Sequence, residues 1–295
     1  MRLKITIILF IIIIPLLAKN NYKQDVDSLI DSSYYKFVEL QFVESLKLAN
    51  KALHIATETK YEKGITYSSL YIAKVLQEAG LRMDALRLIE KIEESKYYKK
   101  DAFLQAETYK LKGRIASYGR LYSLEKEHYL KQLEVSENIP DVKKREMSIT
   151  MAYFYIQHLY VKQNNLDSVE VYQELLKKHL NNTNDSIVSY YYISAYIDKG
   201  LLYTNLGRFD EAAEQLDKSL QLTQKSNTSL LFYSLQIYGD LEMARGDTLK
   251  AVSYYKRALE HSMDLNINHK TMYLHKKISD CLIHDESTIM RQRII

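Results

Sequence analysis

Two pairs of glycines constrain the fold of this chain more than any other feature of its sequence. Gly200 and Gly207 lie seven residues apart, Gly239 and Gly246 have the same spacing, and the second pair follows the first by 39 residues. Aromatic and alanine residues recur at matching offsets around both pairs. Recurrence of the same residue types at a fixed spacing of this size indicates an internal repeat. The chain is therefore predicted to be a repeat array.

The composition agrees with an all-α array. Only 8 Gly and 2 Pro occur in 295 residues, which is hard to reconcile with a many-turned β protein, and 46% of the residues are hydrophobic, so extensive disorder is not expected. The 26 tyrosines are typical of rings that pack between helices; the alternative is that some of them form an aromatic ligand-binding site. A net charge of +4 from well-mixed acidic and basic residues predicts no nucleic-acid partner.

The N-terminus has the pattern of a targeting segment. Arg2 and Lys4 precede an uninterrupted apolar stretch from Ile5 to Ala18, which as a helix is about 21 Å long, against about 30 Å for the hydrocarbon core of a membrane. A secretory signal at residues 1–18 is predicted, cleaved after Ala18, and the mature protein is expected in the periplasm. The alternatives are an uncleaved inner-membrane anchor formed by residues 5–18 and a buried N-terminal strand.

The motif around the glycine pairs resembles the tetratricopeptide repeat (TPR). It reads Tyr196-x-x-x-Gly200-x-x-Tyr203-x-x-x-Gly207-x-Phe209-x-x-Ala212 and recurs, less completely, from Gly239 to Leu259. The resemblance implies a right-handed α-solenoid of about six helix–turn–helix repeats over residues 25–262. The repeat-packing residues carried over by register are Ala73, Gly80, Ala85, Gly113, Gly200, Tyr203, Gly207, Ala212, Gly239, Gly246, Ala251 and Ala258.

The weaker repeats extend the same register. The residue equivalent to Gly200 is Ser33, Ala73, Gly113, Gln157 or Gly239 in the others, which gives a period near 40 residues instead of the usual 34. Two explanations of the long period are open. Each helix is about one turn longer than usual, or the connecting loops are longer, at residues 137–141, 181–185 and 226–229. Three repeats depart from the pattern: Gly119 lies one residue early for the turn, Asn164 replaces the turn glycine, and Glu242 replaces an aromatic residue. A capping helix or partial seventh repeat is predicted at residues 263–284, followed by a short tail at 285–295.

The resemblance also implies where a ligand would bind. TPR ligand contacts come mostly from positions 2, 5, 9, 12 and 13 of the first helix of each repeat, on the concave wall. The groove residues carried over by register are Lys74, Gln77, Lys110, Arg114, Tyr118, His158, Lys162, Asn205, Gln236 and Asp240, flanked by Glu78, Phe154, Leu201 and Tyr233. Lysine and arginine can hold a carboxylate, and amide side chains can pair with an extended peptide backbone. Ordinary solvated positions are the alternative for each of them.

No catalytic motif is found: the sequence has no phosphate-binding loop, nucleophile elbow or His-Glu-x-x-His motif. Cys281 and His284 lack further metal ligands nearby, so neither a metal nor a cofactor is expected. The sequence therefore predicts a non-enzymatic scaffold or sensor that binds a protein or peptide and is exported. It is similar to the sensor region of bacterial membrane-tethered helix–turn–helix regulators, without their membrane span and DNA-binding domain. A truncated or stand-alone relative of such a regulator, and a cytosolic peptide-responsive receptor, are the alternatives; the oligomeric state is left open.

Overall fold

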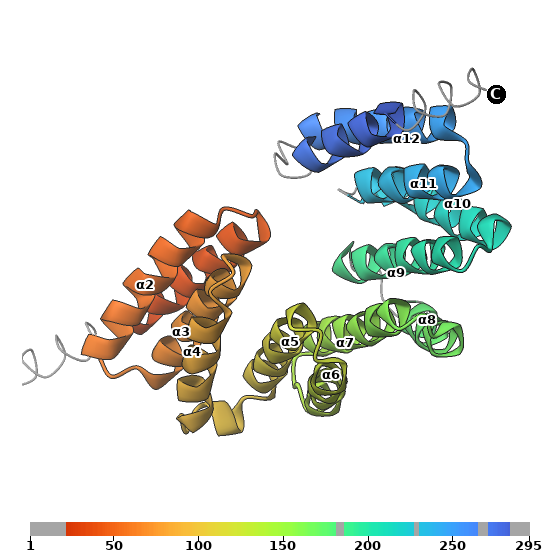
Figure 1. Ribbon diagram of the computed structural model, residues 1–295. Coiled ribbons are helices and arrows are strands. Elements are labelled where there is room, and N and C mark those ends of the chain that lie inside the picture. Colours follow the sequence, from red (N-terminus) through yellow and green to blue (C-terminus); the bar gives the residue numbers. More distant parts are fainter. Residues whose placement is uncertain (1–21, 181–185, 227–229, 265–270, 284–295) are drawn as a thin grey trace, which may run out of the picture. The chain divides into compact units, whose positions relative to one another are not determined.

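The structure of the chain is a computed structural model that describes residues 22–180, 186–226, 230–264 and 271–283 (Figure 1). These residues are helical apart from short turns and contain no β-strand, which confirms the predicted all-α class. Among the helices described, none is sufficiently long and apolar to cross a membrane. The predicted signal or anchor at residues 1–18 and the tail at 285–295 lie outside the described residues.

The helices follow one another as pairs joined by short turns, in the predicted register. We term the first helix of each pair the A helix and the second the B helix. The A helices are residues 22–38, α3 (Glu62–Glu78), α5 (Ala102–Tyr118), α7 (Val142–Lys162), α9 (Ser186–Asn205) and α11 (Leu231–Arg245). The B helices are α2 (Phe42–Glu58), α4 (Arg82–Glu94), α6 (Tyr122–Ser136), α8 (Leu166–Leu180), α10 (Phe209–Ser226) and α12 (Thr248–Asp264). A 3₁₀ helix, η1 (Tyr98–Lys100), separates α4 from α5, and a last helix covers residues 271–283.

The chain divides into two compact units, residues 1–145 and residues 146–295. In the first unit the described A and B helices bury alanines together with larger apolar side chains; Ala49, Ala52 and Ile72 belong to one such cluster. In the second unit, Leu216 and Leu241 belong to one such cluster around α9, α10 and α11. Each helix therefore buries an apolar stripe against its neighbours, as expected of stacked helix pairs.

The turn at the end of each A helix contains one residue with left-handed backbone. These residues are Leu40, Gly80, Arg120, Asn164, Gly207 and Gly246. Each lies seven residues after the predicted small or polar contact residue, so the same offset holds in all six helix pairs. Gly119, the glycine that is one residue early, has φ of −79°, and Arg120 takes the positive φ instead. Asn164 fills the turn as predicted, because asparagine tolerates this conformation.

Three A-helix glycines let a side chain of the following B helix approach the backbone. Tyr129 lies against Gly113, Leu216 against Gly200, and Tyr255 against Gly239. A Cβ on Gly200 would be 2.7 Å from Cγ of Leu216, and one on Gly239 would be 2.8 Å from Cζ of Tyr255. These distances are too short for a carbon–carbon contact, so the predicted small residues are required by the A–B packing.

The long period is explained mainly by helix length. The A helices α3 and α5 have 17 residues, α9 has 20 and α7 has 21. The predicted loop at residues 137–141 separates α6 from α7, whereas 181–185 and 227–229 lie outside the described residues. Longer A helices present more turns on their exposed face, and so more positions where a ligand can be contacted.

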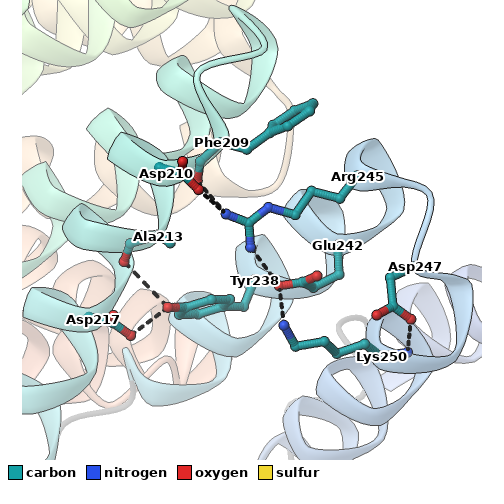
Figure 2. Close-up of polar contacts among 9 residues, drawn as sticks. All are labelled: Phe209, Asp210, Ala213, Asp217, Tyr238, Glu242, Arg245, Asp247 and Lys250. Carbon is teal, nitrogen blue, oxygen red and sulfur yellow. Dashed lines mark hydrogen bonds and ion pairs between the residues drawn. The ribbon is translucent and has the colours of Figure 1, made fainter.

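Figure 2 shows how charged residues join the last two helix pairs. Glu242 stands on α11 where the repeat usually has an aromatic residue, and it is 2% exposed. Its carboxylate accepts hydrogen bonds from Arg245 at 3.2 Å and Lys250 at 2.9 Å. Arg245 also donates to the carboxylate of Asp210 and the backbone carbonyl of Phe209, both at 3.0 Å. A buried carboxylate with two cationic partners thus replaces ring packing at this contact.

Candidate functional site

Charged side chains gather on the A-helix face of the first unit. The α3–α5 cluster, as we term it, comprises Lys74, Gln77, Glu78, Glu107, Lys110 and Arg114. The two carboxylate oxygens of Glu107 accept hydrogen bonds from Lys74 and Lys110, each at 2.5 Å. One turn further along, Arg114 donates to Glu78 at 2.6 Å. Within each helix the members are three or four residues apart, and this spacing places them on one helical face.

Burial makes the charges of this cluster strongly interdependent. Burial alone would raise the pKa of Glu107, but the charges of Lys110 and Lys74 outweigh it and lower its pKa to about 2. The pKa of Lys74 is lowered, first by burial and further by the positive charges of Lys110 and Arg114, although Glu107 opposes this shift. For Lys74, the attraction of a carboxylate that is shared with Lys110 therefore does not fully offset the cost of burial.

Gln77 lies on the same face of α3 and is 1% exposed. Neither its amide nitrogen nor its carbonyl oxygen has a hydrogen-bond partner among the described residues. A buried amide without partners costs about 1–3 kcal/mol, so Gln77 lowers the stability of the chain. Its amide can donate and accept at once, which suits recognition of a peptide group.

The predicted basic half of the groove is therefore present but largely neutralised. Lys74, Lys110 and Arg114 come together as expected, yet the carboxylates of Glu78 and Glu107 are paired with them. Sequence reasoning did not single out Glu107. The signal was available, because Glu107 is at position 2 of the repeat register in which Gly113 is at position 8, and position 2 is one of those that the TPR resemblance implies.

A pocket of about 740 Å³ opens on the A-helix face of the second unit. We term it the terminal pocket; its lining residues are Leu201, Thr204, Asn205, Asp240, Met243, Ala244, Tyr255, Lys277, Asp280 and Cys281. They belong to α9, α11, α12 and the helix at residues 271–283. Two predicted groove residues, Asn205 and Asp240, thus lie in one cavity, together with polar groups of the last helix that were not predicted.

Asp240 is the centre of the polar wall of the terminal pocket. Its Oδ1 accepts hydrogen bonds from the Tyr255 hydroxyl at 2.6 Å and from Lys277 at 2.9 Å. The pKa of Tyr255 is raised, first by burial and then by this hydrogen bond, so its hydroxyl remains a donor. Burial lowers the pKa of Lys277, but Asp240 outweighs it and the net shift is upward. Lys277 therefore stays charged beside Asp240.

Aromatic side chains line the A-helix face between α7 and α9. Phe154 stacks on His158 at a centroid distance of 6.0 Å and contacts Tyr191 at 5.2 Å. Nδ1 of His158 lies 2.6 Å from a carboxylate oxygen of Asp198, which is on α9. The predicted residue His158 is therefore held by a carboxylate of the next repeat.

The remaining predicted groove residues lie apart from these groupings. The ring of Tyr118 is exposed at the end of α5, with the guanidinium of Arg82 stacked 4.2 Å from its centroid. Lys162 is half-buried in the last turn of α7, and Gln236 is half-buried on α11. Within the described ranges, no group of three or more histidine, cysteine or acidic side chains is placed to hold a metal ion.

Comparison with known proteins agrees with this geometry. Residues 193–226 match the family described as Tetratricopeptide repeat, and Gly200 is the eighth residue of the matched segment. No curated protein matches the chain. Similar solved structures include a Rap protein complexed with Competence and Sporulation Factor, which has a TM-score of 0.59 and 13% identity and covers 90% of this chain and 73% of that one.

Two further structures show the same fold. BtubC from P. vanneervenii has a TM-score of 0.56 and 18% identity, and covers 76% of this chain and 92% of its own. A thermophilic TPR protein from Thermus thermophilus has a TM-score of 0.50 and 21% identity, over 74% of this chain and 99% of its own. The chain thus contains a tetratricopeptide repeat at residues 193–226 and has the α-solenoid fold of tetratricopeptide-repeat proteins.

Proposed function

We propose that this chain is a non-catalytic receptor or scaffold that binds a peptide or an extended protein segment on the A-helix face of its TPR solenoid. The terminal pocket carries the proposal, because it is a cavity lined at equivalent positions of successive A helices. Asn205 offers an amide to a peptide backbone, and Asp240 and Lys277 offer charges. The similar fold of the Rap protein, solved with Competence and Sporulation Factor, supports a binding role.

Site-specific photo-crosslinking tests this proposal. A photoreactive amino acid replaces Asn205 in the terminal pocket or Tyr118 at the end of α5, and matched controls carry it at the exposed B-helix positions Glu90 and Lys256. We expect peptide or protein adducts, identified by mass spectrometry, from the A-helix positions and not from the controls. Equal labelling at A-helix and B-helix positions would contradict a binding face formed by the A helices.

We further propose that the chain is exported and acts in the periplasm or at the membrane surface. The support is the basic start and the apolar run from Ile5 to Ala18. Fractionation with determination of the mature N-terminus tests this. A product that begins near Lys19 in the periplasm indicates a free exported binding protein, whereas an intact Met1 in the membrane indicates a tethered sensor. A full-length chain in the cytosol would overturn export and favour a cytosolic peptide-responsive receptor.

A further inference from the structure

The terminal pocket contains one more negative charge than positive charge. Asp240 and Asp280 contribute two carboxylates, and Lys277 contributes one ammonium group, which leaves a net charge of minus one. The rest of the lining is neutral, with Leu201 and Met243 among its apolar members. The field in this cavity therefore favours a ligand with a positively charged group.

The hydrogen bonds of Asp240 leave an acceptor available. Tyr255 and Lys277 both donate to Oδ1, and Oδ2 accepts no hydrogen bond from the described residues. The side chain of Asp240 is 20% exposed, so it retains access to the pocket. A carboxylate can accept about four hydrogen bonds, so Oδ2 is available to a third donor. Asp280, on the helix at 271–283, is exposed and makes no ion pair within the described part of the chain.

Lys277 already occupies part of the space that a cation would use. Its ammonium group lies 2.9 Å from Asp240 and 6.0 Å from the ring centroid of Tyr255. It also lies 5.7 Å from the ring of Tyr273, so it has an alternative aromatic surface on which to rest. An incoming cation therefore meets a carboxylate whose present partner can move aside along its flexible stem.

We propose that the terminal pocket selects peptides that present a lysine or arginine side chain, which binds between Asp240 and Asp280 while Asn205 pairs with the adjacent peptide backbone. This rests on the proposed peptide-binding function and assigns its ligand a charge. Asn205 is exposed at the end of α9, on the same pocket as both carboxylates, so a backbone contact and a cation contact are available to one ligand. The apolar wall formed by Leu201, Met243 and Ala244 accepts the aliphatic stem of such a side chain.

Binding of hexapeptide pools by the full chain tests the proposal. The probes are N-acetylated pools labelled with fluorescein at a C-terminal cysteine, in which one central residue is fixed as arginine, its neutral isostere citrulline, or glutamate. We expect the arginine pool to bind at least about tenfold more tightly than the citrulline pool in fluorescence anisotropy, as a charge-assisted hydrogen bond predicts. Similar binding of all three pools would overturn the charge assignment and leave the peptide-binding function intact, whereas no binding by any pool would contradict that function itself.

Substitutions in the terminal pocket then show which residues cause the preference for arginine over citrulline. Asp240→Asn and Asp280→Asn should each reduce the arginine preference, by about tenfold and about threefold respectively, and Lys277→Gln should strengthen binding of the arginine pool. Asp280→Asn guards against a folding artefact, because Asp280 is exposed. The control Asp167→Asn alters an exposed carboxylate on α8, outside the pocket, and should leave binding unchanged. An undiminished preference in both pocket variants would refute the assignment.

A small cationic molecule is the other source of a positively charged group for this pocket. Agmatine carries a guanidinium group without a peptide backbone, so it should compete with the arginine pool at least about tenfold less well than a short arginine peptide, because the contact with Asn205 is missing. Competition by agmatine at the same concentration as the peptide would overturn a peptide ligand.

Discussion

Gly239→Ala is expected to destabilise the second unit, although alanine is the better helix former. The new Cβ would lie 2.8 Å from Cζ of Tyr255, whose ring is 1% exposed and belongs to a packed cluster. The ring has little freedom to shift, since its hydroxyl is held by Asp240 at 2.6 Å. Either the ring moves and that hydrogen bond is lost, or α11 and α12 separate.

The expected magnitude follows from two opposing contributions. Overpacking a close contact costs about 1–3 kcal/mol, whereas replacing a helical glycine by alanine gains about 1 kcal/mol in helix propensity. The net expectation is a loss of up to about 2 kcal/mol in the free energy of unfolding, with about 1 kcal/mol at the middle of the range. Because repeat arrays need not unfold in one step, the measurement should follow the second unit itself, for example by hydrogen exchange of α11 and α12 across a urea series.

Gly119→Ala provides the matched control. Gly119 has a negative φ at the end of α5, and the nearest atom to a new Cβ is 3.4 Å away, so this alanine has room. It should be neutral or stabilising by up to about 1 kcal/mol. If Gly239→Ala behaved like Gly119→Ala, the close approach of Tyr255 would not limit the side chain at residue 239, and our account of the helix contact would fail.

Three further substitutions test other parts of the fold. Arg120→Gly should stabilise the chain by about 0.5–1 kcal/mol in urea denaturation, because the left-handed turn strains arginine and not glycine, and no gain would show that the turn is unstrained. Glu107→Gln leaves Lys74 and Lys110 without their counter-charge and should cost about 3 kcal/mol, whereas Glu127→Gln, which removes an exposed ion pair, should have a much smaller effect. Since the pKa of Glu107 is lowered to about 2 from 4.5, its contribution should be complete above pH 4.5 and vanish as the pH falls towards 2; a pH-independent difference between wild type and variant would contradict this. Glu242→Ala should lower the melting temperature by removing the shared partner of Arg245 and Lys250, and an unchanged melting temperature would show that the buried carboxylate is not needed.

The fold could be predicted from sequence because its constraints are local and periodic. The contact residues Gly200 and Gly239 and the turn residues seven positions later fix the register of each pair, and the structure shows left-handed backbone at the same offset in Leu40 and Arg120, where there is no glycine. An offset along one helix pair needs no knowledge of the rest of the molecule. This is why even the displaced Gly119 and the substituted Asn164 did not obscure the repeat.

The candidate site could be predicted only in part, because its partners come from neighbouring repeats. Register places Lys74 and His158 on the correct face, but whether Glu107 or Asp198 reaches them depends on the rotamers of side chains 33 and 40 residues away. Likewise Asp240 was predicted, whereas its pairing with Lys277 depends on how the helix at 271–283 packs on α11. A position within a repeat specifies the face of the helix on which a side chain lies. The net charge of the site also depends on the charged side chains of the next repeat.

The contact between Gly239 and Tyr255 connects the terminal pocket to the stability of the α11–α12 pair. Because residue 239 has no side chain, the ring of Tyr255 passes over the backbone of α11 and delivers its hydroxyl to the adjacent residue, Asp240. The carboxylate at the surface is thereby tethered to α12. A ligand that fixes Asp240 would therefore also reduce the opening of the α11–α12 pair, so that binding at the surface is thermodynamically linked to the cohesion of the last repeat.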